Sequence, residues 1–160
     1  MATCNYFCKF EKKVRSSLKK SKKEYSTSIN FGSFIIESED NYEDGDSIEL
    51  DVEYSETAHC CGVVELGDID VQDENKGLIK EEWKIEYIKL LLLHLFKNET
   101  SGKSCKLFQF TIPIRSYRGK IIEDYLLFEK GAIAAGFECV AEFKNSNSGN
   151  LLRHYIKYKL

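Results

Sequence analysis

The chain has 160 residues, of which 42% are hydrophobic and 12% aromatic, with ten glycines and one proline. This length and composition suit one domain with a sizeable buried core, and they exclude a disordered or low-complexity chain. The formal net charge of -3 excludes no class of partner by itself, but the charges are unevenly placed along the sequence.

The first half of the chain predicts a helix followed by a meander of three strands. Apolar residues at every fourth position predict a basic helix over residues 9–24. Strands are predicted over residues 28–37 and, from clean alternation, over residues 48–54, with an Asp-Gly hairpin turn within residues 41–46. A short link at residues 57–59 leads to a third strand over residues 63–71.

The second half predicts a strand–helix–strand unit and a final hairpin. A turn over residues 72–77 leads to a helix over residues 78–96, whose apolar face carries Trp83, Tyr87, Leu91 and Leu95. A strand follows over residues 106–114, and then a helix over residues 122–135 that ends at Gly136. The last two strands are residues 139–143 and an alternating strand that places Leu152, His154, Ile156, Tyr158 and Leu160 on one face.

This order of elements predicts the fold class. A strand–helix–strand unit usually places its two strands parallel, whereas the flanking meander and hairpin are antiparallel. We therefore expect a single α/β domain over residues 1–160, with a mixed, mostly antiparallel sheet around a central strand–helix–strand unit.

Nothing in the sequence has the pattern of a targeting signal or a membrane span. The N-terminus lacks a basic stretch followed by a long apolar run, and apolar runs such as residues 90–93 are far shorter than the roughly 20 residues that cross a membrane. We expect a cytoplasmic protein without membrane contact. Its six cysteines are then expected to be reduced, buried structural thiols.

Charge is separated into two blocks. Residues 9–23 hold eight basic residues, and residues 37–74 hold fifteen acidic residues and no lysine or arginine. Such blocks are typical of solvated faces, and less commonly of surfaces that recruit a charged partner. The basic block contains one aromatic residue, Phe10, and no base-reading motif, so direct nucleic-acid binding is not expected.

Three local features resemble the GNAT family of N-acetyltransferases. They are Ile69-Asp70-Val71 followed by Gly77 and an amphipathic helix, the strand after that helix, and the pair Gly136-Phe137 at the end of the last helix. The resemblance implies a GNAT-like fold over residues 28–160 and transfer of an acetyl group from acetyl-coenzyme A to an amine. It also implies that the backbone of Val71, Lys76 and Gly77 contacts this cofactor.

The chain departs from the family's pattern at two places. Ile79 and Glu81 stand where small residues let the backbone approach a phosphate, and a glutamate in the first helical turn repels that phosphate. The family often has a tyrosine as general acid four residues before the Gly-Phe pair, and that position is Ala132 here. Whether the chain is an enzyme therefore stays open.

The candidate general bases lie along the central strand. Glu65, Asp68 and Asp70 could each accept a proton from an amine if burial raised the pKa of the carboxyl group. Glu65 and Asp68 fall on opposite faces of a regular strand, unless Gly67 introduces a bulge. The alternative is that all three belong to the solvated face of the sheet.

An alternative of a different functional class is that the chain is a non-catalytic binding or inhibitor protein with the same fold. The acidic span of residues 37–74 suggests a surface that mimics phosphate charge and occupies a basic site on another protein, as small phage-type antagonists do. Glu49, Asp51 and Glu53 face one way on their strand and would contact that partner.

Cysteine and histidine spacing favours no metal site. Cys4, Cys8 and the run His59-Cys60-Cys61 lack the paired spacing of structural zinc sites, and adjacent residues in a strand point to opposite faces. A nucleophile pair of Cys61 with His94 or His154 is a further alternative, which no sequence feature brings together.

Overall fold

The computed structural model describes residues 6–20, 24–38, 47–54, 57–74, 79–101 and 105–159. The elements in chain order are α1 (Cys8–Leu18), β1 (Tyr25–Asn30), β2 (Ser33–Ser38), β3 (Ser47–Glu53), β4 (Thr57–Cys60), β5 (Val63–Leu66), β6 (Asp70–Glu74), α2 (Glu81–Thr100), β7 (Leu107–Arg115), α3 (Glu123–Ala134), β8 (Glu138–Lys144) and β9 (Leu151–Tyr158).

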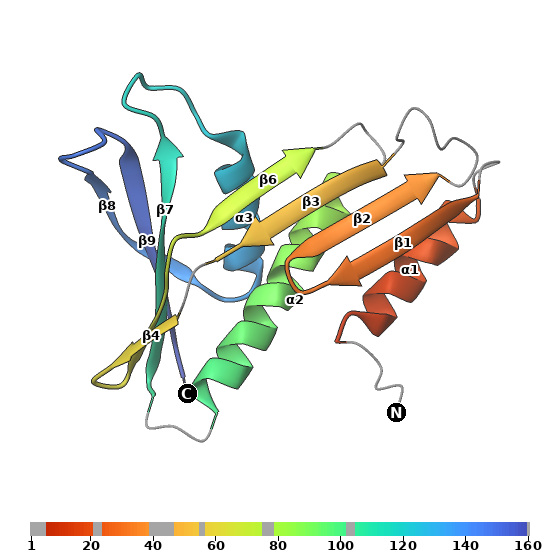
Figure 1. Cartoon of the computed structure of the whole chain (residues 1–160). Coiled ribbons are helices and arrows are strands. Elements are labelled where there is room, and N and C mark those ends of the chain that lie inside the picture. The colour runs from red at the N-terminus through yellow and green to blue at the C-terminus, as the bar shows by residue number, and fades with distance from the viewer. Residues whose placement is uncertain are drawn as a thin grey trace.

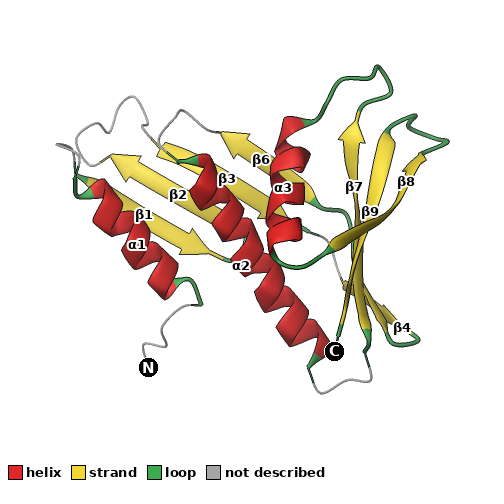
Figure 2. Ribbon diagram, turned by 180° about the vertical axis from the view of Figure 1, so that it is seen from behind, coloured by secondary structure: helices red, strands yellow, loops and turns green. Residues whose placement is uncertain are grey.

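The strands form two sheets with the helices on one side (Figure 1). Sheet A has the order β1-β2-β3-β6, and sheet B has the order β4-β5-β7-β9-β8. Only β5 and β7 pair in parallel; all other neighbours are antiparallel. Seen from behind, α1, α2 and α3 lie in front of sheet A, and sheet B stands to the right of α3 (Figure 2). We call the face of each sheet that points away from the helices its outer face. The predicted α/β domain with a mixed sheet is confirmed.

The predicted three-stranded meander is wrong in its number of strands. The single strand expected over residues 28–37 is a hairpin of β1 and β2, because Gly32 turns the chain with a φ of 108° that other residues rarely adopt. The link expected at residues 57–59 is strand β4, which pairs with β5. The turn expected within residues 41–46 lies outside the described residues.

The core lies between the helices and the inner faces of the two sheets. Trp83, Tyr87, Leu91 and Leu95 of α2 are buried, as their spacing predicts. Helix α3 packs closely on α2, because a Cβ atom added at Gly131 would lie 2.4 Å from Cγ2 of Ile88. Gly131 therefore permits this helix contact, at a position where sequence propensity alone disfavours glycine.

Helix boundaries differ modestly from the predictions. Helix α2 begins at Glu81 and ends at Thr100, and the described part of α1 ends at Leu18. Gly136 ends α3 as expected, with a φ of 91°, while the N–H of Phe137 donates to the Ala132 carbonyl at 3.0 Å. None of the helices in the described ranges is both long and apolar enough to cross a membrane.

Strand β9 ties sheet B to the helices through polar groups. Tyr155 is fully buried on the inner face, and its hydroxyl donates to Glu129 of α3, which also accepts two hydrogen bonds from Arg153. The Lys157 ammonium donates to the Ala135 carbonyl at the C-terminus of α3. A positive charge is favourable there because the C-terminus is the negative end of the helix dipole. The predicted face of Leu152, His154 and Ile156 is thus the outer face, where all three side chains are partly exposed.

Candidate functional site

The central feature of the fold is the point after Leu66 at which the chain ends its parallel pairing with β7. Strand β5 pairs with β7 over Val63–Leu66, and the chain then leaves β7 and continues as β6, which pairs with β3 instead. Asp68 lies in this interruption with a φ of 30°, beside Gly67. The carboxyl-terminal half of β7 therefore pairs only with β9 among the described strands. We call the region between β6 and this half of β7 the splay.

Helix α3 closes the splay with two side chains. The Tyr125 hydroxyl donates to the Ile69 carbonyl at 2.8 Å, and Oδ2 of Asp124 accepts from the Asp73 N–H at 3.4 Å. Burial raises the pKa of Tyr125, the charge of Asp70 adds to this, and a hydrogen bond with the Val71 backbone opposes it. The Ile69 carbonyl and the Asp73 N–H, at the two ends of this edge, thus already have partners within the chain.

A cluster of charged side chains lies beside this closure. The Lys84 ammonium of α2 is 2.8 Å from Oδ2 of Asp73, and Lys84 is only 4% exposed. The other oxygen of Asp73, Oδ1, is buried without a hydrogen-bond partner. Burial raises the pKa of Asp124, and the neighbouring charge of Asp73 acts in the same direction, while the Asp73 N–H and Lys84 oppose it.

A cavity of about 550 Å³ opens at the carboxyl end of β7. Its lining residues come from the β7–α3 connection and the first turn of α3, and they are Ser116, Lys120, Ile121, Ile122, Glu123 and Asp124. The carboxyl ends of parallel strands are common places for ligands in α/β folds. This cavity, with the Asp124 carboxyl in its wall, is the candidate small-molecule site.

The three expected bases lie elsewhere, on the outer side of the sheets. Glu65, Asp68 and Asp70 are all exposed. The interruption around Gly67 shifts the alternation by one residue, so that Glu65 and Asp68 are both exposed while Leu66 and Ile69, which directly follow them, are buried. The change of face comes from the passage of the chain from sheet B to sheet A, and the carboxylic residues that line the cavity are Glu123 and Asp124.

The described residues do not fit coenzyme A. The side chain of Val71 is buried and its backbone is engaged by Tyr125, whereas Lys76 and Gly77 lie outside the described residues. Glu81 and Glu82 occupy the first turn of α2, and the Glu81 carboxylate pairs with Lys130 at 2.7 Å, which lowers its pKa. A cofactor phosphate would meet negative charge there, and a cofactor chain along β6 would have to displace Tyr125 and Asp124.

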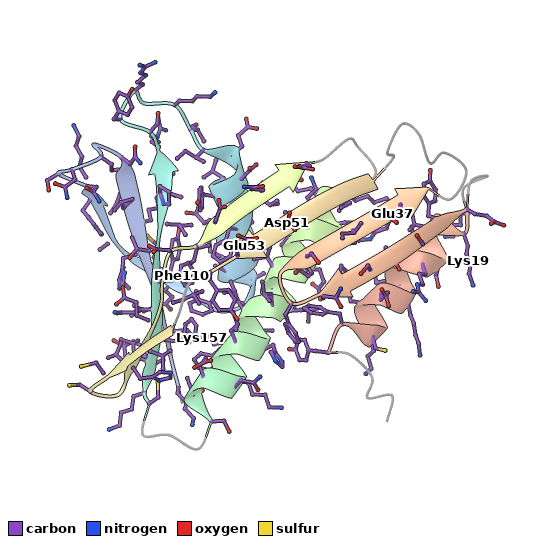
Figure 3. The ribbon with its side chains drawn as sticks, viewed as in Figure 1. Lys19, Glu37, Asp51, Glu53, Phe110 and Lys157 are labelled. Atoms are coloured by element: carbon purple, nitrogen blue, oxygen red, sulfur yellow. The ribbon has the colours of Figure 1, made fainter. Side chains whose placement is uncertain are left out.

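The outer face of sheet A is the second candidate region. Acidic side chains from three of its strands define what we call the acidic face: Glu37 of β2, Asp51 and Glu53 of β3, and Asp70 and Glu74 of β6. Figure 3 labels Glu37, Asp51 and Glu53. Asp51 is half-buried, and the side chain of Glu49 in β3 is not described. Glu53 and Asp70 are register partners, as are Glu49 and Glu74. Like charges in directly opposed positions destabilise a sheet.

No cation compensates this charge within the described strands of sheet A. The sequence contains no lysine or arginine in residues 24–74, and its histidine in that span, His59, belongs to β4 of sheet B. The Asp70 carboxylate has a hydrogen bond from the Gln72 side chain at 3.3 Å. A neutral amide does not remove the mutual repulsion of the carboxylates.

A hollow of about 450 Å³ lies at one end of the acidic face. It is lined by Phe31, Gly32, Ser33, Asp51, Val52, Glu53 and Tyr54. Phe31 is 47% exposed, and its ring contacts those of Phe7 at 5.0 Å and His94 at 4.2 Å between centroids, in tilted arrangements. The hollow therefore combines two carboxylates with two aromatic rings, a combination that suits a guanidinium or ammonium group.

The cysteines differ from the expectation of six buried, reduced thiols. Cys8 is disulfide-bonded. Cys60, Cys61 and Cys139 are free and exposed, and Cys105 is free and buried. The residues that the structure describes contain no group of three potential metal ligands.

The structure does not bring Cys61 together with His94 or His154. The His94 ring contacts the rings of Phe31 and Tyr6, and burial lowers the pKa of His94. The His154 ring contacts the Thr111 hydroxyl and the Gln109 amide within sheet B. Both histidines have structural partners.

Sequence reasoning missed the charged cluster at the splay. Asp73, Lys84 and Asp124 come from three separate elements, and only the tertiary fold brings them together. One signal was present: Lys84 lies four residues before Ile88 and seven before Leu91, on the apolar face of α2, where a lysine needs a buried partner.

Comparisons with known proteins give a fold likeness at low similarity. No family model and no curated protein matches the sequence. One similar solved structure is a protein assigned as an acetyltransferase from Sphaerobacter thermophilus DSM 20745, with 11% identity and a TM-score of 0.36, covering 79% of this chain and 64% of that chain. Another is a chimera of the spermidine N-acetyltransferase SpeG from Vibrio cholerae and hSSAT, with 11% identity and a TM-score of 0.41, covering 79% of this chain and 68% of that one. The chain thus spans slightly less than two thirds of the first protein.

Proposed function

We propose that this chain is a binding protein whose acidic face receives a basic segment of another protein. The observation that carries the proposal is the hollow that joins Asp51 and Glu53 to the exposed rings of Phe31 and Tyr54. An arginine or lysine of the partner would place its cationic group between these carboxylates and its aliphatic stem against the rings.

Electrostatics along the strands favours the same kind of partner. The opposed positions of Glu53 and Asp70 cost roughly 0.2–1 kcal/mol, because like charges directly opposite each other repel. A basic segment lying across β3 and β6 would replace this repulsion by attraction. Such contacts act mainly on the association rate and on specificity, and salt weakens them.

The test is a titration that separates this face from net charge. A fluorescently labelled peptide with alternating arginine and serine is titrated with the wild-type chain and with the triple variant Asp51→Asn, Glu53→Gln, Asp70→Asn. Each exposed charge pair contributes up to about 1 kcal/mol, so we expect roughly 10-fold weaker binding or more. The same peptide with citrulline in place of arginine should bind no better than background.

A matched control carries the same change of net charge on other surfaces. The triple variant Glu82→Gln, Glu123→Gln, Glu138→Gln neutralises three exposed carboxylates that lie outside the acidic face. We expect its affinity for the peptide to stay within about twofold of wild type. Equal losses in the two triple variants would mean that net charge, and not this face, drives capture.

Acetyl transfer is the second candidate function, and the cavity beside Asp124 is the observation that favours it. A carboxyl group with a raised pKa in the wall of a cavity can serve as a general base toward an amine. The donor that the family resemblance implies is acetyl-coenzyme A, and its binding would require Tyr125 to leave the Ile69 carbonyl. In this reading Glu65, Asp68 and Asp70 remain proposed bases on the outer side of the splay.

Calorimetry separates the second candidate from the first. Acetyl-coenzyme A and coenzyme A are titrated into the wild-type chain, into Tyr125→Ala, which frees the edge of β6, and into Lys76→Glu. Binding that strengthens in Tyr125→Ala and weakens in Lys76→Glu would support an acyl-transfer site. If none of the three chains gives a binding heat at millimolar cofactor, the acyl-transfer site is ruled out. The result of the peptide titration is not affected by that outcome.

A further inference from the structure

The turn between β4 and β5 brings two adjacent cysteine sulfurs into contact. Cys60 is the last residue of β4 and Cys61 begins the turn, and their Sγ atoms are 3.4 Å apart. Adjacent residues in a continuous strand point to opposite faces. Here Cys61 has a φ of 55° and Gly62 a φ of 82°, so the chain reverses and both sulfurs lie on the same side.

The turn is anchored at both ends, and its sulfurs remain accessible. The Gly62 carbonyl accepts a hydrogen bond from the Lys106 N–H at 2.8 Å, and the His59 ring contacts the Glu99 carboxylate of α2 at 3.0 Å. Cys60 and Cys61 are both exposed. A cavity of about 170 Å³ opens beside them, lined by His59, Cys60, Cys61, Gly62, Val63, Val64 and Cys105.

We propose that Cys60 and Cys61 form a redox-active dithiol, which closes to a disulfide by exchange with a small-molecule disulfide such as oxidised glutathione. Closure requires the two sulfurs to approach from 3.4 Å to about 2.05 Å, which side-chain rotation in an exposed turn supplies. This modification site is separate from the acidic face and from the splay.

The reaction balances as two exchange steps. The thiolate of one cysteine attacks the glutathione disulfide, forms a mixed disulfide and releases one glutathione thiolate. The thiolate of the second cysteine then attacks the protein sulfur of that mixed disulfide and releases the second glutathione. Both cysteines are oxidised, one glutathione disulfide is reduced to two thiols, and the two cysteine protons pass through solvent to the glutathione thiolates.

The closed form should be readily reversible. Cα atoms of adjacent residues are about 3.8 Å apart across a trans peptide, which is less than the usual separation of about 4.4–6.8 Å in disulfides. The ring between Cys60 and Cys61 is therefore strained, and strained, exposed disulfides are the ones that small thiols reduce.

Cys139 provides an internal comparison. It is an exposed, free thiol in β8, and its Sγ contacts the Ala141 carbonyl at 3.6 Å. Without an adjacent thiol, it should stop at the mixed disulfide with glutathione. Cys105 is 6% exposed and lines the same cavity as Cys60 and Cys61, so it is the competing partner to be tested.

The experiment is peptide mapping by mass spectrometry after treatment of the reduced full-length chain with excess oxidised glutathione. We expect the peptide with Cys60 and Cys61 to lose two hydrogens, and the peptide with Cys139 to gain one glutathione. In Cys60→Ser and in Cys61→Ser, the remaining cysteine of the pair should keep its glutathione, and no disulfide should form within the turn. Cys105→Ser should behave as wild type, and excess reduced glutathione should restore the dithiol.

Two outcomes of this mapping would overturn the proposal. One is stable glutathione on Cys60 or Cys61 in the wild-type chain, which would mean that the second exchange step does not occur. The other is a disulfide between Cys105 and either turn cysteine. The wild-type result decides both outcomes, so the test does not depend on the folding of any variant.

Discussion

The acidic face and the splay both contain carboxylates, but the two regions differ in how the negative charge is compensated. At the splay, Asp73 is paired with the buried Lys84, and Asp124 accepts a hydrogen bond from the β6 backbone. On the acidic face, Glu53 and Asp70 oppose each other across two strands, and the described part of sheet A contains no lysine or arginine. Strand β6 contributes to both regions, with Asp70 facing outward and Asp73 facing the helices.

This difference indicates where a partner is needed. At the splay, Asp73 has its counter-charge in Lys84, and Asp124 already accepts a backbone hydrogen bond, so a ligand at these groups would have to displace existing contacts. Oδ1 of Asp73 is the exception, because it is buried without a hydrogen-bond partner. Charges on the acidic face repel one another, so a cationic partner gains free energy there, and the contact that it would displace at Asp70 is the hydrogen bond from the Gln72 side chain. The splay is thus occupied by the chain's own contacts, whereas the acidic face presents carboxylates that a partner can reach.

The largest expected effect concerns the buried pair at the splay. Lys84→Met leaves the Asp73 carboxylate buried without its counter-charge, so we expect a loss of about 3–5 kcal/mol in the free energy of unfolding. Urea denaturation measures it. Lys130→Met breaks the exposed pair with Glu81 and should destabilise the chain far less, because solvent screens exposed pairs. Similar losses in the two variants would show that the splay is not internally neutralised.

A smaller loss of stability is expected when the hydrogen bond from Tyr125 to the Ile69 carbonyl is removed. Tyr125→Phe removes the hydroxyl that donates to the Ile69 carbonyl, and it should destabilise the chain by about 1 kcal/mol. Hydrogen exchange should then be faster for β6 amides than in wild type, with little change in β1. Unchanged exchange in β6 would mean that Tyr125 does not protect that edge.

Relief of repulsion on the acidic face should stabilise the chain. Glu53→Gln removes one member of the like-charged pair with Asp70, so we expect a gain of roughly 0.2–1 kcal/mol at low salt and a smaller gain at high salt. Glu82→Gln, at an exposed position of α2, is the matched control and should change stability less. A loss of stability in Glu53→Gln would contradict the account of this face.

The smallest expected effect is a change in pH dependence at the splay. Because the folded chain raises the pKa of Asp124, it binds this proton more tightly than the unfolded chain. Its contribution to stability is therefore greatest in acid and decreases as the pH rises from the unfolded value of about 3.9 through the raised folded value. Asp124→Asn should remove this decrease and be slightly more stable at neutral pH, by less than about 1 kcal/mol.

The difference between wild type and Asp124→Asn, measured by urea denaturation across this pH range, isolates the effect of this one group. A difference that is constant with pH would mean that Asp124 titrates alike in the folded and unfolded chains.

Sequence patterns predicted the elements that depend on local periodicity. The apolar face of α2 and the glycine stop of α3 were confirmed, because burial of Trp83, Tyr87 and Leu91 and the φ of Gly136 follow from spacing and residue type. The β1–β2 hairpin was missed because Gly32 is flanked by apolar residues on both sides, as in one continuous strand.

The candidate site could not be predicted in the same way, because it depends on tertiary contacts. The hollow joins Phe31 of the β1–β2 turn to Asp51 and Glu53 of β3, and the register of two hairpinned strands decides that proximity. The contact of Cys60 with Cys61 depends on the left-handed backbone of Cys61, which residue type disfavours.

The most direct test of the central claim is the titration of the arginine–serine peptide at low and at physiological salt. We expect saturable binding that weakens as the salt concentration rises. The affinity should fall roughly 10-fold or more in the variant of Asp51, Glu53 and Asp70, and it should persist in the variant of Glu82, Glu123 and Glu138. Binding that survives neutralisation of the acidic face, in a chain that remains folded, would contradict the central claim.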